Sequence, residues 1–150
     1  MIRIIRTNAE SEDFRKLVAL LDEELAIRDG DEHAFYHQLN IAANLNHTLV
    51  AYYENQPIGC GAFKEFDLDS VEIKRMYVLD DFRKKGVATA ILSELEKWIV
   101  ELGVFKAVLE TGKNQPEAIA LYHKIGYKLI PNYGKYVDVE NSVCFSKKLI

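Results

Sequence analysis

Residues 70–103 change from a strand pattern to a helix pattern across one short basic turn. In the strand part, 70–79, apolar residues alternate, and their parity changes after Lys74, which permits a β-bulge. In the helix part an apolar residue recurs every four positions, at Val87, Ile91, Leu95 and Ile99. Because an amphipathic helix that directly follows a strand buries its apolar side against a sheet, this segment predicts a layered α/β fold.

The same two patterns alternate along the rest of the chain. Strand patterns cover 2–7, 47–54, 58–66, 105–112 and two closing strands within 127–149, and helix patterns cover 8–30, 31–45 and 114–126. Either Asn8 or Ser11 is suited to cap the first helix. The order β-α-α-β-β-β-α-β-α-β-β predicts a mixed sheet of about seven strands with about four helices on its faces. No linker or repeat divides the chain, so we expect one domain over 1–150.

The turn concentrates positive charge where a helix begins, because Arg83, Lys84 and Lys85 stand directly before Gly86. Positive charge is unfavourable at this end of a helix, so a negative partner is expected. The unpaired N–H groups of a first helical turn bind phosphate, and a glycine lets the backbone approach it closely. The turn therefore predicts a phosphate-bearing ligand, with a merely solvated basic turn as the alternative. Neither a P-loop nor a dinucleotide fingerprint is present.

Composition and charge narrow the remaining classes. The chain has 19 basic and 23 acidic residues, a net charge of −4, which argues against a nucleic-acid partner. It has no apolar run long enough to span a membrane and no signal-peptide pattern, so we expect a cytoplasmic protein without a membrane partner. Cys60 and Cys144 lack metal-ligand spacing and are expected to be buried thiols. His33 and His37 have no evident third ligand, so no metal site is expected.

Two sequence blocks resemble one family. The segment MYVLDDFRKKGVA, 76–88, resembles the strand-turn-helix signature of the GNAT superfamily of N-acetyltransferases, whose core Gln/Arg-x-x-Gly-x-Gly/Ala is matched by 83–88. The segment VLETGKNQPEAIALYHKIGY, 108–127, resembles the second conserved block of the same superfamily. This resemblance implies a mostly antiparallel sheet that splays into a V between strands 4 and 5. It also implies acetyl-CoA as co-substrate.

The resemblance further assigns roles to individual residues. Backbone N–H groups from Lys84 to Thr89 would hold the pyrophosphate, and the strand before the turn would pair with the pantetheine arm. Tyr122 matches the tyrosine that protonates the departing thiolate, and Gln115 stands where many members have asparagine. The implied cofactor residues are Met76, Tyr77, Val78, Arg83, Lys84, Lys85, Gly86, Val87, Ala88, Thr89, Gln115 and Tyr122.

The resemblance also implies the reaction, which is direct attack of an amine on the thioester. The amine must first lose a proton, because an alkyl ammonium has a pKa of about 10. Glu72 and Glu110 are candidate bases, a water chain is a third possibility, and the sequence does not choose among them. Glu72 is expected on the strand face that also carries Val78.

The resemblance implies that the first helices and the last strand loop build the acceptor site, and these segments contain an aromatic and histidine cluster and a tyrosine. Carboxylates and aromatic rings suit a cation, so a small-molecule amine is the expected acceptor. A non-catalytic acetyl-CoA sensor is the alternative function, and a homodimer is left open. The expected acceptor residues are His33, Phe35, Tyr36 and Tyr133.

Overall fold

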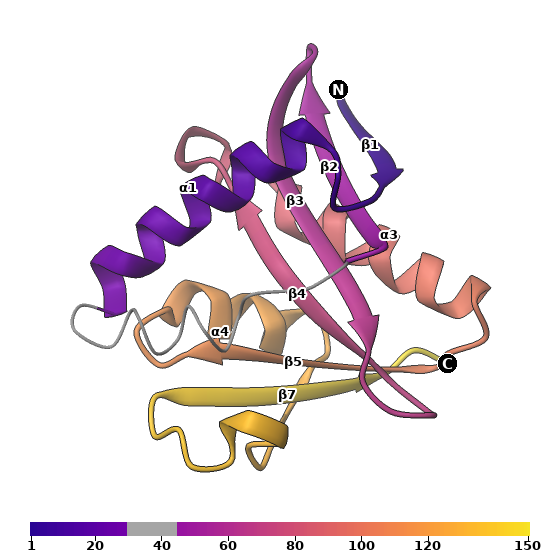
Figure 1. The fold of residues 1–150 in the computed structure, drawn as a ribbon, viewed down its shortest axis with the longest axis vertical. Helices are drawn as coiled ribbons and strands as arrows, with labels where there is room; N and C mark the ends of the chain where they lie inside the picture. Colours follow the sequence, from indigo (N-terminus) through magenta and orange to yellow (C-terminus); the bar gives the residue numbers. More distant parts are fainter. Residues whose placement is uncertain (30–44) are drawn as a thin grey trace.

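The computed structural model, which describes residues 1–29 and 45–150, contains one seven-stranded sheet in the order β1-β2-β3-β4-β5-β7-β6 (Figure 1). All neighbouring strands are antiparallel except β4 and β5, which are parallel. The predicted mixed, mostly antiparallel sheet is therefore confirmed. The strands are β1 Ile2–Thr7, β2 His47–Tyr53, β3 Gln56–Glu65, β4 Val71–Val78, β5 Lys106–Gly112, β6 Lys128–Ile130 and β7 Ser142–Lys148.

The helices cover both faces of the sheet. The described residues form α1 Glu12–Asp29, α3 Val87–Glu101 and α4 Pro116–Lys124, with short 3-10 turns η2 Asp80–Phe82 and η3 Gly134–Tyr136. The further helix expected over 31–45 lies outside the described residues, apart from Leu45. α1 packs on one face through one core cluster, and α3 and α4 pack on the other through a second cluster.

Local sequence explains where the helices begin. The Ser11 hydroxyl accepts a hydrogen bond from the Phe14 N–H at 3.2 Å, so Ser11 rather than Asn8 caps α1. Pro116 occupies the first turn of α4, where its missing N–H costs no hydrogen bond.

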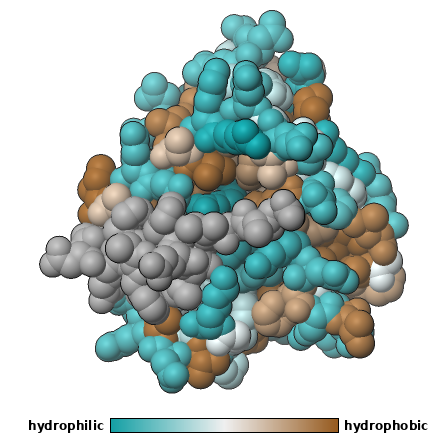
Figure 2. All heavy atoms as spheres, in the orientation of Figure 1, coloured by the Kyte–Doolittle hydropathy of each residue, from teal (hydrophilic) through white to brown (hydrophobic). Residues whose placement is uncertain are grey.

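Among the described residues, no helix is long and apolar enough to cross a membrane. Hydrophilic residues predominate on the described surface that Figure 2 shows.

Two glycines in β3 allow α3 and β4 to approach closely. A Cβ at Gly61 would lie 2.7 Å from Met76 Sδ and 2.9 Å from Ile91 Cγ2, and one at Gly59 would lie 2.9 Å from Ile91 Cδ1. No side chain fits in that space without moving its neighbours. This tight packing fixes the N-terminus of α3 relative to β4.

A β-bulge interrupts β4, at the place where the sequence permits one. Cys60 faces Tyr77, but Ala62 faces Lys74, so Gly61 of β3 stands opposite two residues of β4. The first of these two, Arg75, has φ 59°, in the left-handed region.

The bulge changes which side chains share a face. Val71 and Ile73 lie in the same core cluster as Val78, on the α3 side. Glu72 alternates with Val71 and Ile73 and therefore lies on the opposite face. The expectation that Glu72 shares the face of Val78 is wrong, because it counted residues across the bulge as if the strand were regular.

The V between strands 4 and 5 is present. β4 pairs with β5 only from Val71 to Ile73, and the register ends at the pair Ile73–Leu109. Beyond this pair the two strands diverge (Figure 1).

Contacts with two other elements hold the bulge. The Arg75 guanidinium pairs with Asp22 of α1 at 2.9 Å, and the Cys60 thiol donates to the Arg75 carbonyl at 3.3 Å. Burial raises the pKa of Cys60 to about 12, so this thiol keeps the proton that it donates. Cys60 and Cys144 are both buried and unpaired, as predicted.

The left-handed conformation of Arg75 gives a prediction about stability. Arg75→Ala and Arg75→Gly both lose the ion pair with Asp22, but only glycine adopts a positive φ without steric cost. In urea unfolding, we expect the alanine variant to be less stable than the glycine variant by about 1 kcal/mol. Asp22→Asn reports the loss of the ion pair alone. Equal stability of the alanine and glycine variants would show that the bulge is not strained.

Candidate active site

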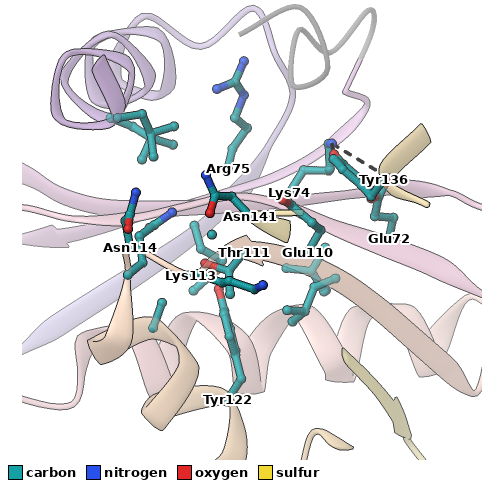
Figure 3. A pocket seen from close by; sticks show the side chains of 18 residues that line it. Glu72, Lys74, Arg75, Glu110, Thr111, Lys113, Asn114, Tyr122, Tyr136 and Asn141 are labelled. Carbon is teal, nitrogen blue, oxygen red and sulfur yellow. Dashed lines mark hydrogen bonds and ion pairs between the residues drawn. The ribbon is translucent and has the colours of Figure 1, made fainter. Parts of the chain in front are cut away.

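The opening of the V contains a cavity of about 110 Å³ (Figure 3). Its walls come from β4, β5, α4, α1 and the loops that follow β5 and precede β7. The cavity therefore lies where the two parallel strands separate, between helices from both faces of the sheet. Its lining residues with ionisable side chains are Glu72, Lys74, Arg75, Glu110, Lys113, Tyr122 and Tyr136.

At one end of the cavity is a polar cluster formed by the buried residues Glu72, Lys74 and Tyr136 and the half-buried Tyr133. Tyr133 donates to Glu72 Oε2 at 2.8 Å, and Lys74 Nζ donates to the Tyr136 hydroxyl at 3.1 Å and lies 3.9 Å from Glu72 Oε1. The side chains of Lys74 and Glu72 are only 5% and 4% exposed. Burial lowers the pKa of Lys74, and the charge of Glu72 opposes that shift.

The polar cluster includes a residue that sequence reasoning missed, Lys74. The sequence feature that could have pointed to Lys74 is a pair of opposite charges, Glu72 and Lys74, at alternate positions of an otherwise apolar strand. The expected acceptor residue Tyr133 contacts the rest of the cluster through Glu72 and through the edge-to-face packing of its ring with that of Tyr136. His33, Phe35 and Tyr36 lie outside the described residues.

Glu110 and Tyr122 line the cavity from β5 and α4. Glu110 Oε2 accepts a hydrogen bond from the Ser142 hydroxyl at 2.6 Å. Tyr122 is 6% exposed, and Figure 3 shows its side chain rising from α4 toward the cavity. Burial, and then the charge of Glu110, raise the pKa of Tyr122 above its usual value. The phenol is therefore protonated at neutral pH and in the right state to donate a proton.

The basic turn places a left-handed glycine directly before a helix. Gly86 precedes α3 with φ 84°, and no side chain of the described residues caps the helix. The N–H groups of the first helical turn have no acceptors within the helix. Lys84 and Lys85 are exposed, Val87 is buried, and Ala88 and Thr89 complete the first turn.

Arg83 does not point freely toward solvent. It donates to the Val78 carbonyl at 2.8 Å, pairs with Glu24 of α1 at 2.8 Å and lies over the Tyr77 ring. Arg83 therefore ties the turn to β4 and α1. The sequence could not show this, because Glu24 is remote in the chain.

The other expected cofactor residues lie near the same opening. Met76 and Gln115 line the cavity, and Tyr77 and Val78 continue β4 toward the turn. The Gln115 N–H donates to the Gly112 carbonyl at 3.0 Å, which shapes the loop before α4. Within the described residues, no group of three or more His, Cys, Asp or Glu side chains could hold a metal ion.

Comparisons with known proteins point to one family. The model of the acetyltransferase (GNAT) family matches residues 11–127. The uncharacterized N-acetyltransferase YsnE of Bacillus subtilis (strain 168) is 33% identical over 101 residues, which cover 66% of this chain and 67% of YsnE.

Solved structures agree with this match. A crystal structure from Klebsiella pneumoniae, assigned to the acyl-CoA N-acyltransferases, has TM-score 0.83 and 26% identity, and the comparison covers 100% of this chain and 99% of that one. A GNAT family acetyltransferase from Elizabethkingia anophelis with acetyl-CoA bound has TM-score 0.69 and 19% identity over 98% and 97% of the two chains, a likeness of fold. Together with the family match over most of the sequence, this shows that the chain belongs to the GNAT family of acetyltransferases.

Proposed function

We propose that this single domain transfers the acetyl group of acetyl-CoA to a small primary amine, by direct attack within a ternary complex. The observation that carries the proposal is the cavity in the V, where Tyr122 and Glu110 line the space between the diverging strands. Family membership supplies the acetyl transfer, and the similar structure from Elizabethkingia anophelis was determined with acetyl-CoA bound.

The cofactor would bind along β4 and the basic turn. The uncapped N–H groups at the start of α3 would bind the pyrophosphate, which supplies the negative charge that this helix end favours. Lys84 and Lys85, both exposed, would add electrostatic attraction. The pantetheine arm would follow β4 beyond Ile73, where the pairing with β5 has ended.

The chemistry then needs a base, an acid and the loss of two protons from the nitrogen. Glu110 would take the first proton from the acceptor ammonium, so that the neutral nitrogen attacks the thioester carbonyl. A nitrogen–carbon bond forms, a backbone N–H of β4 would stabilise the oxyanion, and the carbon–sulfur bond then breaks. Tyr122 would donate its proton to the departing thiolate and regain one from the attacking nitrogen, so that the products are a neutral amide and free CoA, and the proton on Glu110 is released to solvent.

Glu110 is a better base than Glu72 in this arrangement. The carboxylate of Glu72 already accepts a hydrogen bond from Tyr133 and lies beside the buried Lys74 ammonium, whereas Glu110 accepts a hydrogen bond from the neutral Ser142 hydroxyl. Glu110 lies close enough to Tyr122 to raise its pKa, which puts the base beside the proposed acid.

The choice of base gives a prediction. Glu110→Gln should lower kcat near pH 7 by about 100-fold, the size of a general-base contribution. The loss should shrink as pH rises toward the amine pKa of about 10, because the amine then deprotonates without help. Glu72→Gln is the matched control and should lose less activity at neutral pH. A pH–rate profile of both variants checks this, and equal, pH-independent losses would contradict the assignment.

Thiol release from acetyl-CoA, measured across a panel of amines, tests the function itself. Turnover with some primary amine and detection of the N-acetyl product by mass spectrometry are expected. Tight binding of acetyl-CoA without turnover on any amine would instead support a sensor.

A further inference from the structure

We propose that the acceptor amine also carries a carboxylate, as a 2-amino acid does, and that Lys74 and Tyr136 bind this carboxylate. The inference rests on the proposed function and adds the substrate class. It follows from the composition of the cavity wall and from the positions of its buried charges.

Lys74 is an unusual residue to find in the wall of an amine-binding cavity. Its side chain is 5% exposed and lines the cavity, and its ammonium contacts the Tyr136 hydroxyl at 3.1 Å. Removing an ammonium from water costs free energy that only nearby acceptors and opposite charges offset. Glu72 offsets part of that cost, because its Oε1 lies 3.9 Å from Lys74 Nζ, while its Oε2 accepts a hydrogen bond from Tyr133. An entering carboxylate would add a second anion to the same site.

The balance of charge along the described wall favours a zwitterion over a simple cation. Arg75 is already paired with Asp22 of α1, so the other charged residues of the described lining are two basic and two acidic ones: Lys74, Lys113, Glu72 and Glu110. A diamine or polyamine would therefore meet as many positive as negative groups. A molecule with one ammonium and one carboxylate matches both signs, which is the usual basis of electrostatic selectivity.

The positive and negative groups of the cavity wall also lie close together. Figure 3 shows Lys74, Tyr136 and Glu110 at the same end of the cavity, and they come from β4, η3 and β5 respectively. The charge of Glu110 acts on Lys74, since it raises the pKa of the ammonium against the effect of burial. In a 2-amino acid the ammonium and carboxylate are attached to one carbon. The amine would face Glu110 and Tyr122 while the carboxylate faces Lys74 and Tyr136.

Matched pairs of substrates provide the experiment. Each pair is an amino acid and the amine that decarboxylation would leave: histidine and histamine, tyrosine and tyramine, lysine and cadaverine. We expect kcat/KM to favour the best amino acid over its own decarboxylated amine by about tenfold or more, the effect of a charge-assisted hydrogen bond. Equal or faster acetylation of the decarboxylated amines would overturn the proposal and leave the proposed function intact. Binding of acetyl-CoA without turnover on any compound would overturn both.

Variants of Lys74 test whether this residue causes the preference for an amino acid over its decarboxylated amine. Lys74→Met keeps the length and loses the charge, so it should lower kcat/KM for the amino acid at least about tenfold more than for the decarboxylated amine. Lys113→Met, a change to another lysine of the same wall, is the control and should keep the preference. An equal loss on both members of a pair, at unchanged acetyl-CoA affinity, would show that Lys74 serves only the fold. If Lys74→Met does not fold, Tyr136→Phe should raise KM for the amino acid selectively, and an unchanged KM overturns the proposal.

Discussion

Gly86→Glu should raise the Kd for acetyl-CoA by about 100-fold, equivalent to about 2.7 kcal/mol. The substitution places a carboxylate at the uncapped start of α3, where the proposed pyrophosphate binds. Two negative groups about 4 Å apart repel by several kcal/mol near a protein surface, and the backbone N–H groups would lose their close approach to the ligand. Isothermal titration with CoA and acetyl-CoA measures the effect directly.

Gly103 provides a matched control at the other end of the same helix. Gly86 and Gly103 both have φ 84°, and an added Cβ would meet no atom within 4 Å at either position. Gly103→Glu should therefore carry the same backbone strain, about 1–2 kcal/mol of stability, without affecting the cofactor. Gly86→Ala separates strain from charge and should bind acetyl-CoA far better than Gly86→Glu. A folded Gly86→Glu variant with unchanged cofactor affinity would refute the assignment of the turn to the pyrophosphate.

Tyr122→Phe should lower kcat by about 100-fold or more, because it removes the proposed proton donor to the departing thiolate. The ring remains, so its contacts with Tyr127 and Phe145 remain too, and the Kd for acetyl-CoA should change little. Single-turnover measurements at saturating acetyl-CoA separate the chemical step from binding.

A neighbouring tyrosine controls for the loss of a buried hydroxyl. The Tyr127 ring lies 5.8 Å from that of Tyr122, and its hydroxyl donates to Glu96 at 3.0 Å. Tyr127→Phe should cost about 1 kcal/mol of stability with kcat near that of the wild type, because Glu96 keeps its ion pair with Lys147. Wild-type turnover by Tyr122→Phe would remove Tyr122 as the acid.

The features that were predictable from sequence depend on contacts close together in the chain. A helix cap at Asn8 or Ser11, the glycine turn at Gly86 and the parity change in β4 are signals within a few residues, and the structure has a cap, a left-handed glycine and a bulge at these places. The parity change after Lys74 permitted the bulge. Its consequence for Glu72 was missed, because a single extra residue moves every later side chain to the other face.

The features that were not predictable depend on partners far away in the sequence. A lysine in a strand is usually solvent-exposed, and Lys74 is buried because Tyr136, 62 residues later, provides its acceptor. The sequence suggested that Arg83 could bind a phosphate, but in the structure its guanidinium pairs with Glu24 of α1. Helix and strand propensity and residue spacing carry no information about such distant pairs. The sequence therefore pointed to the strands and the turn around the candidate site, but not to which of its charged side chains pair with each other.

The end of the β4–β5 pairing at Ile73 means that this sheet has two edges in its interior. Past that point, within the described part of the chain, each strand is hydrogen-bonded to a neighbour on one side only, β4 to β3 and β5 to β7. Exposed strand edges invite pairing with other chains, but here the two edges border the cavity that α1 and α4 also line. A ligand that carries amide groups can complete both ladders as an extra strand would. Such a ligand binds only the folded chain, so it should protect the protein against unfolding and aggregation in addition to taking part in the reaction.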